Sequence, residues 1–149
     1  MIATADKLSL KEKIAYSFGD AASNLYWKTF EFFLVIFYTD VFGISAAAVG
    51  TMLLVTRVLD AVADPVMGAV ADRTKTRWGH FRPYIVWFAL PLAVAGVLTF
   101  TTPNLGSGAK VVYAYVTYGL LMFLYTAVNI PYTALMGVIT PNSIERTAL

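Results

Sequence analysis

The stretch AAAVGTMLLVTRVLDAVADPVMGAVA, residues 46–71, decides the fold class. Its charged side chains are Arg57, Asp60 and Asp64, and most of the rest is apolar. It is longer than the roughly 20 residues that a helix needs to cross a hydrocarbon core of about 30 Å. It lacks the polar–apolar alternation of a barrel strand and is about twice too long for one. The stretch therefore predicts a transmembrane helix, which satisfies its own backbone hydrogen bonds.

Three further apolar stretches flank this one, at residues 16–42, 83–102 and 111–139, with short connections between them. The chain is 58% hydrophobic and 13% charged, whereas a soluble domain is about half apolar and a quarter charged. We therefore predict an all-α membrane protein with four transmembrane helices.

The composition also excludes several classes of protein. Disordered chains are poor in apolar residues. A chain with no cysteine has neither a disulfide scaffold, a zinc finger nor a thiol nucleophile. A net charge of +2 gives no argument for a nucleic-acid partner. The first apolar stretch is too long and too polar in its first half for a cleavable signal peptide, so we expect a retained helix.

The lysines and arginines predict the orientation, because cytoplasmic segments of membrane proteins carry an excess of them. Lys110 stands alone between the third and fourth stretches. The other basic residues outside the stretches lie before the first, between the second and third, or after the fourth: Lys7, Lys11, Lys13, Arg73, Lys75, Arg77, Arg82 and Arg146. This distribution predicts that both ends of the chain are cytoplasmic and that the protein passes several times through the plasma membrane, the inner membrane of a bacterium.

The first predicted helix carries a polar face. At 100° per residue, Asp20, Asn24, Lys28 and Glu31 fall within a stripe of about 80°. A charge at the bilayer centre costs about 2.5–3.5 kcal/mol on the most lenient scale, so these residues are expected to face a partner or a cavity. They line a substrate path on one interpretation. On the other, Lys28 and Glu31 neutralise one another three residues apart.

The second predicted helix places Arg57, Asp60 and Asp64 on one face. Two carboxylates at i and i+4 repel if both are ionised, and a bound cation or a shared proton relieves that repulsion. Because Arg57 neutralises one charge, roughly one negative site remains for a mobile cation. The functional interpretation is a cation-coupled carrier, and the alternative is a structural network that holds helices together.

Two faces of the later helices differ in character. Tyr125 and Asn129 cluster with Tyr118 and Tyr132 on the fourth helix, and such amides and aromatic rings suit a sugar. Polar residues of this kind also serve simply to hold membrane helices together. On the third helix the small residues Ala89, Ala93 and Gly96 indicate close helix packing.

Three motifs together carry a resemblance to a known family. They are Tyr38-Thr39-Asp40-Val41-Phe42-Gly43, Arg57-x-x-Asp60-x-x-x-Asp64-Pro65-x-x-Gly68 and Arg77-Trp78-Gly79-x-Phe81-Arg82-Pro83. A fourth follows in Tyr125-Thr126-x-x-Asn129-Ile130-Pro131-Tyr132, and the match continues to Glu145-Arg146-Thr147. The chain resembles the glycoside–pentoside–hexuronide:cation symporters of the major facilitator superfamily over nearly its whole length.

The resemblance implies a twelve-helix fold, of which these four helices form the first part, and sugar uptake driven by a sodium or proton gradient. It assigns the coupling cation to Asp60, Asp64 and Thr126, a possible Na⁺ lying at the two aspartates, and implies no other metal or cofactor. Substrate-binding positions fall on Asn24 and Asn129, to which the polar faces above add Asp20 and Tyr125.

Two details refine these expectations. Both sugar-binding positions hold amides, as in the pentoside and glucuronide branch, so we expect a pentoside or hexuronide. Ala63 stands where melibiose-type members have asparagine and offers no oxygen, which favours a proton over sodium. Residues expected to have structural or gating roles complete the site assignment: Arg57, Gly68, Asp72 and Arg73.

The sequence also bears on functions other than transport. The spacing of the aspartates does not match the signatures of membrane phosphotransferases, and both lie on one helix, unlike those of intramembrane aspartyl proteases, so no enzyme is expected. A lipid substrate stays open because animal lipid carriers share the fold. If the chain truly ends at Leu149, a non-transporting scaffold is the alternative. Otherwise its partners are a sugar or glycoside, the bilayer and the missing C-terminal helices.

Overall fold

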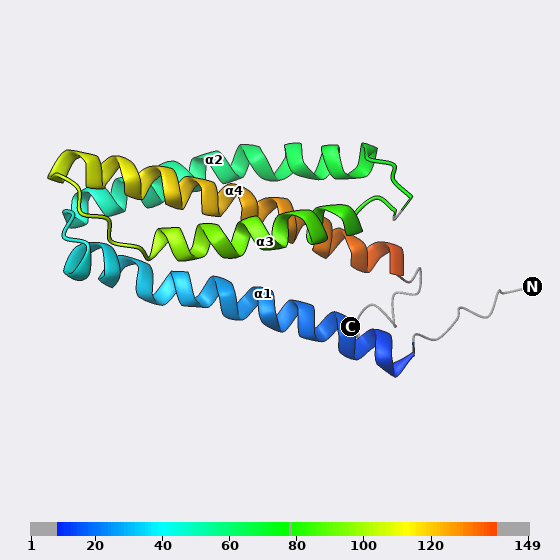
Figure 1. Ribbon diagram of the computed structural model, residues 1–149. Coiled ribbons are helices and arrows are strands. Elements are labelled where there is room, and N and C mark those ends of the chain that lie inside the picture. Colours follow the sequence, from blue (N-terminus) through cyan, green and yellow to red (C-terminus); the bar gives the residue numbers. More distant parts are fainter. Residues whose placement is uncertain (1–8, 78, 140–149) are drawn as a thin grey trace, which may run out of the picture.

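The described part of the chain consists of four long helices (Figure 1). The computed structural model describes residues 9–77 and 79–139, except for the side chain of Ile139. In chain order the elements are α1 (Leu10–Ile36), the π-helix η1 (Phe37–Val41) that continues it, α2 (Ala46–Arg73), α3 (Arg82–Thr99) and α4 (Ser107–Ile139). The expectations for Lys7, Trp78, Glu145, Arg146 and Thr147 fall outside these residues.

Local sequence signals account for the helix starts. Ser9 and Glu12 form a capping box at the start of α1: the Ser9 Oγ accepts from the Glu12 N–H at 3.3 Å, and the Glu12 carboxylate accepts from the Ser9 N–H at 2.9 Å. Hydrogen bonds from the Ser9 hydroxyl and backbone lower the pKa of Glu12. The Ser45 Oγ accepts a hydrogen bond from the Ala48 N–H at 3.2 Å and so caps α2. Gly43, with φ of +78°, makes the turn between η1 and α2.

Three of the helices are long and apolar enough to cross a membrane, namely α2, α3 and α4 up to Val138, as judged by length and composition over the described residues. The helix α1 is not among them, although an apolar span was expected at 16–42. Asp20, Lys28 and Glu31 lie within its length and lower its apolar content. A helix with such a polar stripe needs a cavity or other helices beside that face.

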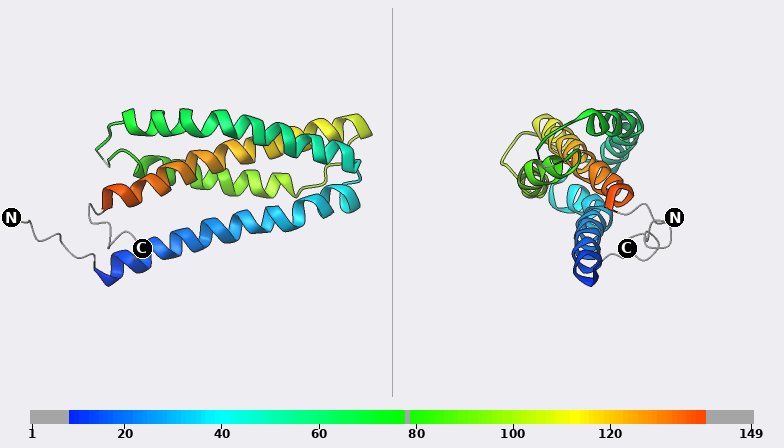
Figure 2. Two further views of the ribbon diagram at one scale, coloured as in Figure 1. Left: turned by 180° about the vertical axis from the view of Figure 1, so that it is seen from behind. Right: turned by 90° about the vertical axis from the view of Figure 1, so that its right-hand side faces the viewer.

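The helix α4 is central to the bundle. It makes its most extensive contacts with α3 and α2. Side chains connect it to α1, where the rings of Tyr16 and Tyr132 stack with their centroids 4.9 Å apart. Figure 2 shows α4 crossing between α2 and α3, with α1 on the remaining side. The segment between α2 and α3 lies at the same end of the bundle as the start of α1, so Arg73 and Lys75 share an end with Lys11, and Lys110 lies at the other.

The buried core lies toward the end of the bundle that contains η1. Its residues come from the second half of α1, η1, the start of α2, the end of α3 and the first half of α4, and include Phe30, Tyr38, Phe42, Met52 and Ala95. Toward the opposite end α1 diverges from the other helices (Figure 1). The buried core is therefore concentrated at one end of the bundle, and at the other end α1 keeps contact with α4 through the stacked rings of Tyr16 and Tyr132.

The small residues predicted on α3 do mark a close approach. Tyr26 of α1 packs directly over Gly96, where an added Cβ would collide with the tyrosine hydroxyl. The same hydroxyl donates to the Leu92 carbonyl at 2.8 Å. The glycine thus allows α1 and α3 to be joined by a hydrogen bond to the helix backbone.

Candidate functional site

The two aspartates of α2 lie against α4 near the middle of the bundle. Asp60 and Asp64 are partly buried and separated by one turn, and Thr126 is buried on the facing side of α4. The Thr126 Oγ1 donates to the Asp64 Oδ1 at 3.2 Å. All three residues expected at a cation site therefore meet on one seam between two helices.

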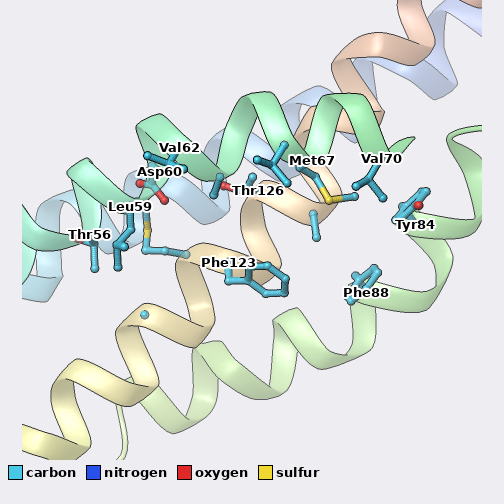
Figure 3. Close-up of a pocket in the computed structure, with 15 residues that line it drawn as sticks. Thr56, Leu59, Asp60, Val62, Met67, Val70, Tyr84, Phe88, Phe123 and Thr126 are labelled. Atoms are coloured by element: carbon cyan, nitrogen blue, oxygen red, sulfur yellow. The ribbon is translucent and has the colours of Figure 1, made fainter. Parts of the chain in front are cut away.

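A cavity of about 650 Å³ opens beside this seam (Figure 3). Asp60 and Thr126 lie on its wall, and nearly all of the other lining side chains are apolar: Leu59, Val62, Val66, Met67, Val70, Phe88, Met122 and Phe123 among them. Apolar surroundings disfavour an unpaired ionised carboxylate. The arrangement therefore favours neutralisation of Asp60 by a proton, a cation or a partner side chain.

Arg57 is not an ion-pair partner of either aspartate. These three residues are all described, and no ion pair within 4.0 Å joins Arg57 to Asp60 or Asp64. Instead the guanidinium Cζ lies 5.5 Å from the centroid of the Trp27 ring. That Arg57 neutralises one of the aspartates stays a prediction, and in the structure its guanidinium makes a cation–π contact with α1.

Two of the expected substrate residues, Tyr125 and Asn129, meet at a serine of α1. The Ser23 Oγ donates to the Asn129 Oδ1 at 3.3 Å and lies 3.4 Å from the Tyr125 hydroxyl. The Tyr125 ring in turn stacks on Trp27, with centroids 4.9 Å apart. Hydroxyl and amide groups from α1 and α4 are therefore assembled at one place, on a second seam between these two helices. Tyr125 of this seam directly precedes Thr126, which belongs to the seam between α2 and α4.

The remaining expected substrate residues, Asp20 and Asn24, lie on the exposed stripe of α1. The Asn24 Nδ2 donates to the Asp20 Oδ2 at 3.1 Å. Farther along this stripe Lys28 and Glu31 form an ion pair at 2.6 Å, as one interpretation of their spacing predicted. Within the described part of the chain this stripe is exposed. No hydrogen bond there joins the side chains of Asp20 and Asn24 to the group formed by Ser23, Tyr125 and Asn129.

Of the residues expected to have structural or gating roles, Arg57 lies beside Trp27, Gly68 faces Ile130 of α4, and only Asp72 and Arg73 lie apart from both seams. Asp72 and Arg73 are exposed at the end of α2, about 12 Å of helix beyond Asp64. The Asp72 carbonyl oxygen lies 3.2 Å from the Nδ1 of His80 in the following segment. An added Cβ on Gly68 would lie 3.9 Å from Ile130, which is ordinary contact, so no steric demand for glycine exists there.

Sequence reasoning missed Ser23 and Trp27 as members of the site. Both border the polar stripe of α1 on its α4 side, since Trp27 lies seven residues after Asp20 and is displaced from it by only about 20°. A tryptophan at the edge of a charged stripe was the available signal. The sequence alone does not tell which helix this tryptophan meets, because that depends on the position of α4 in the fold.

The sequence profile of the family described as MFS/sugar transport protein matches residues 15–149. The chain belongs to this family. Membership confirms the all-α membrane fold and the resemblance to the major facilitator superfamily, and it agrees with the expectation that the chain is no enzyme.

Relatives within the family share about half of their residues with the chain. The inner membrane symporter YicJ of Escherichia coli is 52% identical over 97% of this chain. The isoprimeverose transporter of Lactiplantibacillus pentosus is 52% identical over 93%, and the glucuronide carrier protein homolog of E. coli is 44% identical over 96%. The chain spans 32%, 29% and 32% of the length of these relatives, respectively.

Proposed function

We propose that this chain forms part of a secondary active transporter in the bacterial inner membrane, which imports a sugar or glycoside together with a cation. The cation is held by Asp60, Asp64 and Thr126. The observation that carries the proposal is the contact of 3.2 Å between Thr126 and Asp64 beside the Asp60 carboxylate. The contact supports the proposal because two neighbouring carboxylates repel when both are ionised, and a bound cation would relieve that repulsion.

A proton is the proposed coupling ion. Sodium prefers several oxygen ligands, as hard cations do, and the neighbouring Ala63 supplies none. The cavity beside Asp60 is lined mainly by apolar side chains. A carboxylate needs only one proton to become neutral there, so a protonated pair is stable without further ligands.

The proposed substrate is a pentoside or a hexuronide. Asn24 and Asn129 present amides, which donate and accept hydrogen bonds with hydroxyls and do not repel a substrate carboxylate. The names of the isoprimeverose transporter and the glucuronide carrier homolog among the relatives favour these two classes. Asp20 and Tyr125 complete the proposed substrate set, and further helices beyond these four enclose the sugar path together with the exposed stripe of α1.

Uptake measurements test the proposal directly. The protein is expressed from its complete reading frame, and accumulation of isoprimeverose and of a glucuronide is followed with and without a proton or sodium gradient. Asp64→Asn is expected to abolish accumulation against a gradient and to retain exchange, because the amide cannot take up and release a proton. Glu12→Gln removes a carboxylate outside the spans and serves as the control. Accumulation that survives in Asp64→Asn would overturn the cation assignment.

A further inference from the structure

We infer that Trp27 is a positioning residue that transmits the state of the aspartate pair to the substrate residues, an inference that rests on the proposed function. Its indole contacts Arg57 of α2 on the cation side and Tyr125 of α4 on the substrate side.

A chain of contacts links Arg57 to the substrate residues, and Arg57 shares a helix face with Asp60. Arg57 lies three residues before Asp60 on α2, so the two side chains share a face of the helix. Its guanidinium lies 5.5 Å from the Trp27 centroid, and the Trp27 ring stacks on Tyr125 at 4.9 Å with an angle of 27° between the planes. The Tyr125 hydroxyl lies 3.4 Å from Ser23, which donates to Asn129.

Arg57 has two kinds of electron-rich neighbour. One is the aspartate pair on its own helix, and the other is the face of the Trp27 indole. Glu31 lines the same small cavity of about 100 Å³ as Arg57 and Trp27, but it is already paired with Lys28 at 2.6 Å. The lysine therefore reduces the competition of this third carboxylate for the arginine.

Loading of the aspartate pair changes the balance between these neighbours. A cation or proton removes negative charge from the pair, so the attraction between Arg57 and the carboxylates weakens. The cation–π contact between Arg57 and Trp27 then becomes relatively more favourable. Unloading draws the guanidinium toward the carboxylates and releases the indole. Since Trp27 stacks on Tyr125, how firmly the substrate residues are held in position depends on the charge of the aspartate pair. Coupling between two sites requires such a difference in contacts between the loaded and unloaded states.

The alternative is that Trp27 only packs α1 against α4. Packing alone predicts that truncation weakens substrate binding equally at all cation concentrations. Coupling predicts that truncation acts mainly on the increase in affinity that the cation produces. The two interpretations are therefore separated by the cation dependence of affinity and not by affinity itself.

The test uses the purified protein from its complete reading frame. The Kd of isoprimeverose and of p-nitrophenyl glucuronide is measured at low and high concentrations of protons and, separately, of sodium. Trp27→Leu is expected to reduce the cation-induced increase in affinity by about threefold or more, and Trp27→Phe by less, because phenylalanine keeps the stack but binds cations more weakly. Trp87→Phe, which alters an exposed indole on α3, serves as the matched control.

Intrinsic fluorescence supplies a second readout that does not depend on uptake. The emission change on cation addition is expected in the wild type and in Trp87→Phe, and is expected to disappear in Trp27→Phe and in Arg57→Gln. A cation-induced increase in affinity that is equal in the wild type, Trp27→Leu and Trp27→Phe would overturn the inference alone. A wild type in which neither cation changes the affinity for either glycoside would overturn both the inference and the proposed function.

Discussion

The helix α1 meets the rest of the bundle differently at its two ends. Its second half and η1 are held by packed aromatic rings. The ring centroids of Phe30 and Phe37 each lie 5.1 Å from that of Phe100. Its first half is held by hydroxyl contacts such as those of Tyr132 with the Tyr16 carbonyl and of Ser23 with Asn129. Apolar packing depends on close fit, whereas hydroxyls can exchange partners. The comparison indicates a fixed apolar end and an adaptable polar end, with the candidate site between them near the middle of the bundle.

The largest expected effect tests whether α1 is fixed at its glycine contact with α3. Gly96→Ala places a Cβ against the Tyr26 hydroxyl, so the helices must separate or the hydrogen bond to Leu92 must break. We expect a loss of about 1–3 kcal/mol, typical of overpacking, seen as a lower unfolding temperature of the purified protein. Gly50→Ala on α2 is the control, because no atom lies within 4 Å of its added Cβ. Equal stability of the two variants would show that α1 moves freely over α3.

The next effect concerns the seam between α2 and α4. Thr126→Val keeps the shape of the side chain and removes the hydroxyl that donates to Asp64 at 3.2 Å. Such polar contacts between membrane helices are worth about 0.6–1.7 kcal/mol, so we expect the half-saturating cation concentration for uptake to change by about threefold to twentyfold. Uptake by cells at varied pH and sodium concentration measures this change.

A matched threonine distinguishes the contact from general polarity. Thr133 lies two turns farther along α4, and its hydroxyl donates only within the helix, to the carbonyls of Asn129 and Ile130. Thr133→Val is expected to leave the cation dependence of uptake unchanged. If both valine variants shift it alike, the seam between α2 and α4 has no special part in cation binding.

A smaller effect is expected where the connection after η1 meets α4. The Lys110 Nζ donates to the Phe42 carbonyl at 3.0 Å and lies 5.4 Å from the centroid of its ring. Lys110→Met removes the hydrogen bond and keeps the aliphatic chain, so we expect a loss of about 1 kcal/mol in thermal unfolding. Lys75→Met, at an exposed position between α2 and α3, should change stability little. A Lys110→Met variant as stable as wild type would mean that this carbonyl finds another donor.

Much of the fold followed from the sequence because its causes are local. The apolar length of 46–71 is sufficient to predict α2, which the structure places at Ala46–Arg73. The close approach at Gly96 also followed from small residues on one face. The divergence of α1 at its polar end could not be predicted, because it depends on which residues of α4 face it.

The candidate site was also predicted only in part, because some of its features are local to one helix and others depend on contacts between helices. The residue types and the helical spacing of Asp60 and Asp64 are visible in the chain, and the resemblance supplied Thr126. The placement of Arg57 on Trp27 instead of on a carboxylate was not visible, since an arginine one turn from an aspartate is expected to pair with it. A contact between two helices decides that choice, and no spacing within one helix encodes it.

The smallest effect tests an exception at the apolar end. Tyr38 is fully buried, and its hydroxyl lies near the Thr117 side chain without reaching hydrogen-bond geometry with any group in the part of the chain that the structure describes. Removing an unsatisfied buried polar group relieves a desolvation cost, so Tyr38→Phe is expected to leave thermal stability unchanged or to raise it by up to about 1 kcal/mol. Tyr132→Phe removes the donor to the Tyr16 carbonyl at the polar end and should lower stability instead. A destabilised Tyr38→Phe would mean that this hydroxyl is bonded after all, and that the apolar end too is held in part by polar contacts.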